Sequence, residues 1–434
     1  MPRRIQAILL LSALVAAPAA GVLAVCAGPS CERPARAEAR VPFCSLPDEL
    51  RTLISGGFRE GRSPEVLAVA ADAGIRGGTG FQGPLQPAWP SLASATRAEV
   101  PVAFVGPGIE PRTLPDGFGL DDVAPTLADI IGLRRPHPEV RSGQEVRGLW
   151  SQAPPRLAVE VVLKGVGTPD ITQPGWGFLA QLARRGAATP NAATGSLPLD
   201  PAAIVTTIGT GGLPRQHGIT GTLVRNDSGR LVRAWGAGAP VSVIATLADD
   251  LDHRTRHKAM VGLVATSASD RGIIGKNWYL DADRATVLVA PRDAAAAATE
   301  ILRTGYGDDG VADLLAVVAQ DRPPSLGRLL RRLEAAAGRA SGGSFVLVVT
   351  ATGSALGRFG GRRAAEVVDH VERTMPGVVE AAAAGGLFLD QGVAARRSIS
   401  EDAVVRALAA MRSRGRPALD DSFGSNAVSF GRYC

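Results

Sequence analysis

The chain has 434 residues, of which 45% are hydrophobic and 20% charged, so it can bury a large core in one domain or two. Aromatic residues make up only 4%, which argues against a stacking surface for single-stranded nucleic acid. The net charge of +6 comes mainly from arginines scattered along the sequence. With no basic stripe and no nucleic-acid motif, this charge indicates a solvated surface, and no nucleic-acid partner is expected.

An export signal is predicted at the start of the chain. Two arginines precede the apolar, helix-forming run Ile5–Ala20, and small residues lie near its end. If the run extends to Val25, it is almost long enough to span a bilayer, so an uncleaved membrane anchor is the alternative. We assign residues 1–26 to a signal peptide or anchor and residues 27–43, rich in Pro, Arg and Ala, to a linker. Either assignment places the protein outside the cytoplasm, secreted or membrane-anchored.

Apolar runs typical of β-strands alternate with helix-like stretches in the rest of the chain. The runs predicted as strands are 66–70, 100–105, 157–163, 260–264, 286–290, 345–349 and 387–389. The stretches predicted as helices include 46–54, 122–131, 177–185, 241–251, 325–337, 362–373 and 401–412. This alternation indicates an α/β fold with a mostly parallel central sheet and helices on both faces.

Four segments after a connector at about residue 150 share features with one known family. The strand from residue 157 ends at Lys164, and residues 195–219 read GSLPLDPAAIVTTIGTGGLPRQHGI, with Ser196 near the start and His217 near the end. Two further segments read FVLVVTATGSALGRFGG from residue 345 and GLFLDQGV from residue 386. Together they resemble conserved blocks of the alkaline phosphatase superfamily, in particular its type I phosphodiesterase branch.

The resemblance implies an alkaline-phosphatase-like three-layer sandwich, whose active members hold two zinc ions with Asp and His ligands. It maps the nucleophile to Ser196 and gives His217 a structural role in a turn. The positions that correspond to metal ligands are Lys164, Gly353, Gly357, Asp390, Gln391 and Phe81. Of these, only Asp390 has a side chain that binds zinc well.

The blocks occur in a rotated order. GFREGRSPEVLAVA, from residue 57, and GTGFQGP, from residue 78, resemble blocks that follow the others in the family, as do residues 100–133. The resemblance therefore implies a circular permutation, which is tolerable where domain termini lie close together. It predicts that the strand at 66–70 lies in the same sheet as the strand ending at Lys164.

Under the permutation, two segments make up the core. Residues 44–150 correspond to the C-terminal part of the family core, and residues 157–434 correspond to its N-terminal and central part. The resemblance is weakest in residues 220–340, which are expected to form a variable cap or insertion.

The four cysteines are Cys26, Cys31, Cys44 and Cys434, all near the ends of the chain. An even number of cysteines in an exported protein suggests disulfides. If the termini meet, as the permutation implies, Cys44 and Cys434 are the expected pair. The alternative is that Cys26 leaves with the signal and the other three stay free.

The replaced ligands predict a pseudoenzyme with a binding or scaffolding role and no cofactor. One carboxylate does not hold zinc, and Ser196 without a metal or a base is a poor nucleophile. The alternative is an active phosphatase or phosphodiesterase that uses Ser196 and zinc. Lys164 is expected to pair with Asp390, as a compensating ion pair or as part of an anion site. The partner is unknown; an anionic small molecule and an envelope polymer are both compatible with the sequence.

Overall fold

The computed structural model describes residues 41–434, apart from positions 73, 82–84, 281 and 358–360. The predicted signal or anchor, most of the linker, Cys26 and Cys31 therefore lie outside the described residues. Residues Val41–Cys434 form one compact unit. Within the described ranges, no helix has the length and apolar character needed to cross a membrane.

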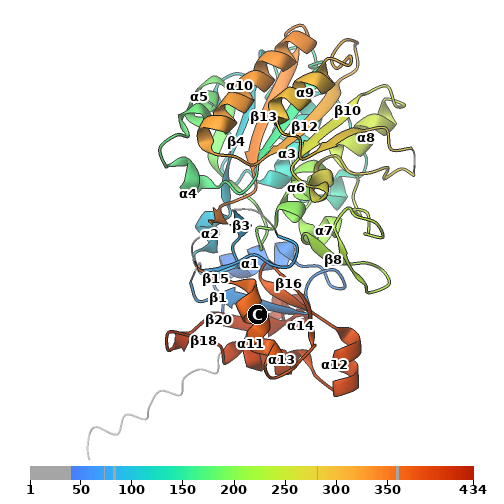
Figure 1. Cartoon of the computed structure of the whole chain (residues 1–434). Coiled ribbons are helices and arrows are strands. Elements are labelled where there is room, and N and C mark those ends of the chain that lie inside the picture. The colour runs from blue at the N-terminus through green and yellow to red at the C-terminus, as the bar shows by residue number, and fades with distance from the viewer. Residues whose placement is uncertain (1–40, 73, 82–84, 281, 358–360) are drawn as a thin grey trace, which may run out of the picture. The chain divides into compact units, whose positions relative to one another are not determined.

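An eight-stranded sheet in the order β11-β10-β12-β6-β13-β4-β7-β5 contains the largest hydrophobic core (Figure 1). Its strands are β4 (Glu99–Val105), β5 (Arg112–Thr113), β6 (Leu157–Leu163), β7 (Ala187–Ala193), β10 (Val261–Ala265), β11 (Thr286–Val289), β12 (Asp313–Ala319) and β13 (Phe345–Ala351). The five neighbouring strands from β11 to β13 are parallel, whereas β4 is antiparallel to both β13 and β7. The predicted mostly parallel α/β sheet is confirmed.

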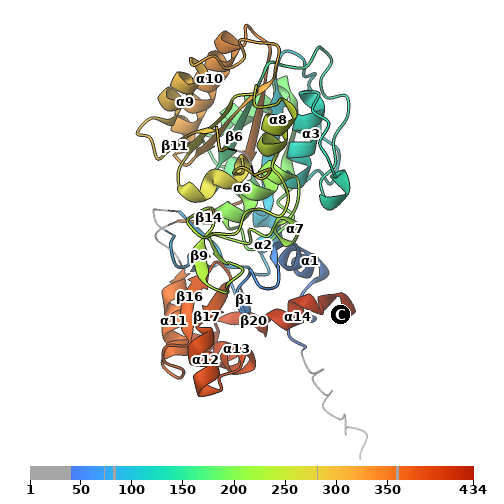
Figure 2. The same cartoon turned by 90° about the vertical axis from the view of Figure 1, so that its right-hand side faces the viewer.

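Helices cover both faces of this sheet. Figure 2 shows α9 and α10 on one side and α3 and α8 on the other. The helices of this region are α3 (Val123–Ile130), α5 (Gly177–Arg185), α6 (Pro201–Thr210), α8 (Leu247–Arg254), α9 (Ala294–Leu302) and α10 (Pro323–Ala340). Helix α10 begins at two prolines, which suit the first turn because its N–H groups have no partner inside the helix.

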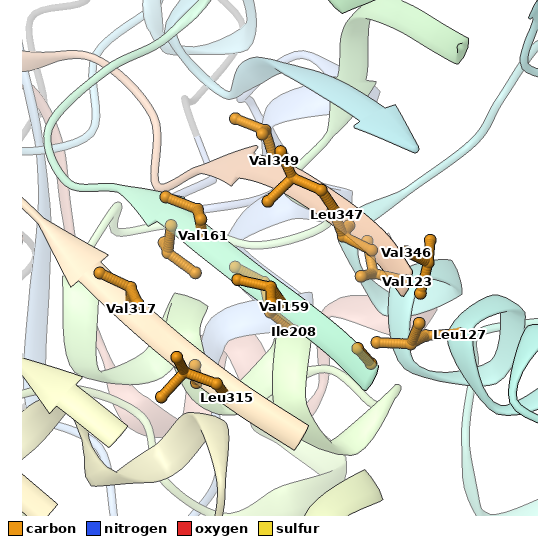
Figure 3. Packing of buried hydrophobic residues seen from close by; sticks show 14 of the residues in the cluster. Val123, Leu127, Val159, Val161, Ile208, Leu315, Val317, Val346, Leu347 and Val349 are labelled. Atoms are coloured by element: carbon orange, nitrogen blue, oxygen red, sulfur yellow. The ribbon is translucent and has the colours of Figure 1, made fainter. Parts of the chain in front are cut away.

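Strand register explains the core between β6 and the helices α3 and α6. Val159 of β6 lies opposite Leu315 on one neighbour and Leu347 on the other. Because facing residues share one side of a sheet, the three side chains form a row, and Figure 3 shows Ile208 of α6 and Leu127 of α3 in the same cluster. Strands buried on both faces read as nearly continuous apolar runs, and β6 does so apart from Glu160.

A second, four-stranded antiparallel sheet has the order β16-β17-β1-β20. It consists of β1 (Val66–Ala70), β16 (Val379–Ala383), β17 (Gly386–Leu389) and β20 (Leu419–Gly424), with α11 (Ala364–Glu372), α12 (Gln391–Arg397) and α13 (Glu401–Ala409) beside it. The prediction that the strand at 66–70 joins the sheet of β6 is therefore wrong. An apolar run shows that a strand is buried, but not which strand it pairs with.

A large part of residues 220–340, expected to form a variable cap or insertion, belongs to the central sheet. They supply β10, β11 and β12 to the central sheet, and β12 is buried along its whole length. The helix expected from residue 241 begins only at Leu247, because Thr246 caps it. The Thr246 hydroxyl accepts from the Asp249 N–H at 3.1 Å, and the Asp249 carboxylate accepts from the Thr246 N–H at 3.0 Å.

The two ends of the described unit meet, and the predicted disulfide between Cys44 and Cys434 is present. Helix α1 (Asp48–Gly57) follows Cys44, and α14 (Ser425–Ser429) precedes Cys434. Phe43 packs edge-on against Phe423 of β20, with ring centroids 5.1 Å apart. The first residues of the unit are thus part of its core.

Short elements complete the unit. The two-stranded pairs are β2 (Ile75–Arg76) with β15 (Arg362–Arg363), β3 (Gln86–Pro87) with β14 (Ala355–Leu356), β8 (Leu223–Arg225) with β9 (Leu231–Arg233), and β18 (Arg412–Ser413) with β19 (Arg416–Pro417). The short helices are α2 (Ser94–Arg97), α4 (Thr168–Ile171), α7 (Pro214–His217) and the 3-10 helices Leu120–Asp122, Pro138–Val140, Ala268–Ile273 and Gly431–Tyr433.

Candidate functional site

A cavity of about 400 Å³ lies at the carboxyl ends of four parallel strands of the central sheet. Each strand contributes the residue that directly follows it: Lys164 after β6, Thr266 after β10, Gln320 after β12 and Thr352 after β13. In open α/β sheets, ligands bind outside the carboxyl ends of the strands. We therefore take this cavity, here called the main cavity, as the candidate site.

Lys164 is the central charged group of the main cavity. Its Nζ donates to Asp270 Oδ1 at 2.6 Å and to Thr266 Oγ1 at 2.8 Å. The other oxygen of Asp270 accepts from the Thr266 hydroxyl and from the backbone N–H groups of Thr266 and Ser267. The Asp270 side chain is fully buried, whereas 14% of the Lys164 side chain is exposed and lines the cavity. Lys164 thus lines the cavity, and its ammonium is held in place by the buried Asp270 carboxylate and the Thr266 hydroxyl.

The expected pair between Lys164 and Asp390 is wrong. Asp390 lies at the start of α12, next to the four-stranded sheet, where its Oδ1 accepts from the Val393 N–H at 2.8 Å as a helix cap. Gln391 is the first residue of the same helix. The carboxylate that does bind Lys164, Asp270, was missed. A signal existed, because Ser-x-x-Asp directly after a predicted strand is the pattern of a capping box, and it places Asp270 near that strand end.

The other positions mapped as metal ligands are only partly brought together. Gly353 and Phe81 line the main cavity with Lys164, whereas Gly357 is exposed and its carbonyl oxygen accepts from Arg76. An ammonium, a glycine and a phenyl ring offer no zinc ligand, so the residues at these positions do not fit the metal. Among the residues that the structure describes, no group of three or more His, Cys, Asp or Glu side chains is placed to hold a metal ion.

Ser196 does not line the main cavity. It is fully buried, and its hydroxyl has no hydrogen-bond partner among the described residues. The part of this block that borders the cavity is the start of α6, at Pro201 and Ala202. Asp200 caps that helix by accepting from the Ala202 N–H at 2.9 Å, and it also accepts from the N–H and hydroxyl of Thr222. Burial raises the pKa of Asp200, and these hydrogen bonds and the charge of Lys164 oppose that shift.

His217 fixes the turn at the end of α7. Its Nδ1 accepts from the Ile219 N–H at 3.1 Å, and its Nε2 lies 3.1 Å from the Thr207 hydroxyl oxygen. Burial lowers the pKa of His217 to about 3, so the ring is neutral and its remaining proton is on Nε2, which donates to Thr207. These contacts join α7 to α6, in line with the structural role expected from the sequence.

A second cation reaches the main cavity from the hairpin β8–β9. Arg233, the last residue of β9, is exposed and lines the cavity beside Gly80. The hairpin is attached to the four-stranded sheet through Arg225, which donates to Glu65 at 2.5 Å and to Glu380 at 3.0 Å. The sequence offered no signal for Arg233, because its many arginines are scattered.

Lys164 and Arg233 are the charged residues among those that line the main cavity. Thr222, Ser269 and Thr352 also line the cavity, and the Thr222 hydroxyl donates to Asp200. Arg233, together with Lys164 in its pair with Asp270, makes the cavity lining positive, which favours an anion. Comparisons of this chain with models of protein families, with curated proteins and with solved structures found no match. The function is therefore argued from the cavity itself.

Proposed function

We propose that this protein is a non-catalytic binding protein whose main cavity holds a small anion, such as phosphate or a phosphate ester, without a metal ion. The observation that carries the proposal is Lys164, which lines the cavity and whose ammonium is held in place by Asp270 and Thr266. A cation fixed in this way attracts an anion without reorganising. Arg233 adds a second positive charge to the cavity lining.

The side chains present support the proposal of a non-catalytic role. The residue mapped as nucleophile is buried away from the cavity, and the mapped ligand positions provide no zinc ligand there. The hydroxyl nearest to the ammonium, on Thr266, already donates to Asp270 at 2.6 Å, in a capping contact. These features favour binding over turnover.

The resemblance to the alkaline phosphatase superfamily remains part of the proposal, although fewer features support it than the sequence suggested. The helix–sheet–helix layers fit it, and β4, from the front of the chain, lies between β13 and β7. The joined ends, through Cys44 and Cys434, fit a permuted chain. The position of β1 does not fit the permutation as first formulated. Export is also proposed, because disulfides persist in oxidising compartments.

Binding of phosphate or phenylphosphonate, measured by calorimetry in a buffer with a chelator, tests the proposal. Lys164→Met alone leaves Asp270 buried without its partner, which is destabilising, so the informative variant is Lys164→Met with Asp270→Asn. We expect it to fold and to bind the anion at least about tenfold more weakly, because a charge-assisted contact is lost. Lys276→Met, at an exposed lysine outside the main cavity, is the matched control.

The alternative function is a metal-dependent phosphatase or phosphodiesterase with Ser196 as nucleophile. It requires Ser196 to move out of its buried position. Turnover of a nitrophenyl phosphate ester with zinc or manganese, lost in Ser196→Ala, would establish the alternative and overturn the binding proposal.

A further inference from the structure

The geometry points to an elongated ligand with two anionic groups, one at Lys164 and the other in a neighbouring crevice. This inference rests on the proposed function, because it extends the same site. A second cavity of about 460 Å³ lies at the carboxyl ends of β10, β11 and β12 and is here called the side crevice. Thr266 and Gln320 line both cavities, so the two cavities adjoin at the sheet edge.

The sheet sets the length of the combined groove. Lys164 follows β6, and Arg292 lies three residues after the end of β11. Strands β6 and β11 are separated by β12 and β10, so their ends are three strand spacings apart. At about 4.8 Å per spacing, this separation is about 14 Å, which is longer than a single phosphate group and suits an extended molecule.

The side crevice is positively charged on balance. Arg292, Arg328 and Arg332 line it, together with the carboxylates of Asp293 and Asp321. The Asp293 carboxylate is already engaged, because it caps α9 by accepting from the Ala296 N–H at 2.9 Å and pairs with Arg332 at 2.8 Å. Arg292 and Arg328 are exposed and can turn toward a ligand. A second anionic group is therefore favoured at this end of the groove.

Polar side chains lie between the two charged ends. The amide of Gln320 and the hydroxyl of Ser267 border the main cavity, and the hydroxyl of Ser325 borders the side crevice. These polar groups can form hydrogen bonds with the hydroxyl or ether oxygens of a ligand. An alkyl chain in the same place would remove their hydrogen bonds to water without replacing them, which costs free energy. The ligand class that fits is a hydroxylated chain with an anionic group at each end, as in a phosphorylated oligosaccharide.

The test uses two series of simple probes and the full chain. Linear α,ω-bisphosphonates with increasing linker length are compared with monophosphonates of the same chain length, by calorimetry in a buffer with a chelator. When a linker spans both sites, the second contact becomes intramolecular and affinity rises. We expect the best bisphosphonate to bind at least about tenfold more tightly than its matched monophosphonate, with a maximum at an intermediate or long linker.

Variants assign the two ends. Arg292→Gln with Arg328→Gln is expected to remove the gain of the bisphosphonate and to leave monophosphonate binding unchanged, whereas Arg233→Gln weakens both. Arg303→Gln, at an exposed arginine outside the groove, is the control. If monophosphonates bind at Lys164 but bisphosphonates bind no better, the extended ligand is refuted and the proposed function stands. If neither series binds, both are refuted.

Discussion

Glu160, in the middle of β6, provides the sharpest test of the central sheet. It lies on the opposite face of the strand from Val159 and Val161, with Ala316 and Val348 directly opposite it on the neighbouring strands. Only 3% of its surface is exposed. Burial among these apolar neighbours raises the pKa of Glu160 to about 8, because the charged carboxylate loses its hydration.

Because its pKa is raised, Glu160 makes the folded protein less stable as the pH rises. The contribution of Glu160 to the free energy of unfolding is fully present below pH 4.5, the ordinary pKa of a glutamate. It is lost as the pH rises toward about 8, because over that range Glu160 ionises freely only in the unfolded chain. At about 1.4 kcal/mol per pH unit, the total loss is about 5 kcal/mol. In Glu160→Gln, which cannot ionise, we expect this slope to disappear.

The assay is urea unfolding followed by circular dichroism at a series of pH values from 5 to 8.5. The diagnostic quantity is the slope of the free energy of unfolding against pH, since a buried amide shifts the absolute value by an amount of its own. Glu110→Gln, at an exposed glutamate, should reproduce the slope of the wild-type protein. Parallel pH profiles for the wild-type protein and Glu160→Gln would show that Glu160 is not buried as a neutral acid, and would refute the packing described for this face.

Three other predictions concern the rest of the molecule. Asp250→Asn should cost about 3–5 kcal/mol in urea unfolding, because Arg135 and Arg141 are both buried against this fully buried carboxylate. Replacing both cysteines of the disulfide with serine should lower the free energy of unfolding by up to about 6 kcal/mol, since a link between residues 390 positions apart restricts the unfolded chain, and a reducing agent should lower wild-type stability to the same level. His217 has a folded-state pKa of about 3, below its ordinary 6.5, so its contribution is present above pH 6.5 and is lost as the pH falls toward 3; His217→Gln should flatten this acid limb of the unfolding profile.

Local structure was readable from the sequence because it depends on neighbours along the chain. Strand β6 and helix α5 have the predicted bounds, because β6 is apolar apart from Glu160 and α5 shows a clear helical period. The start of α8 was missed because the apolar residues before Thr246 continue the pattern, whereas the capping hydrogen bonds of Thr246 end it. Such bonds are local, so a closer reading of the Thr-x-x-Asp spacing would have found this boundary.

The pairing of distant segments was not readable in the same way. The burial of β1 was predicted, but its partners β17 and β20 lie more than 300 positions away, and nothing in an apolar run selects them. The sequence did not predict the partner of Lys164 in the candidate site, for the same reason. The strand motif predicted that Lys164 lies at the end of a strand. Its partner Asp270 lies in residues 220–340, where the resemblance to the alkaline phosphatase superfamily is weakest. The chemistry of the main cavity depends on that partner.

The bond between Cys44 and Cys434 makes the described unit a covalent ring. A protease that cuts one exposed loop inside the ring opens it without releasing a fragment, because both new pieces stay joined through the sulfur atoms. Only a second cut, or a reductant, separates them. Nicked molecules should therefore migrate as one species on a gel without reductant and as two with it. A protein built in this way can be cut once and still keep its two pieces together.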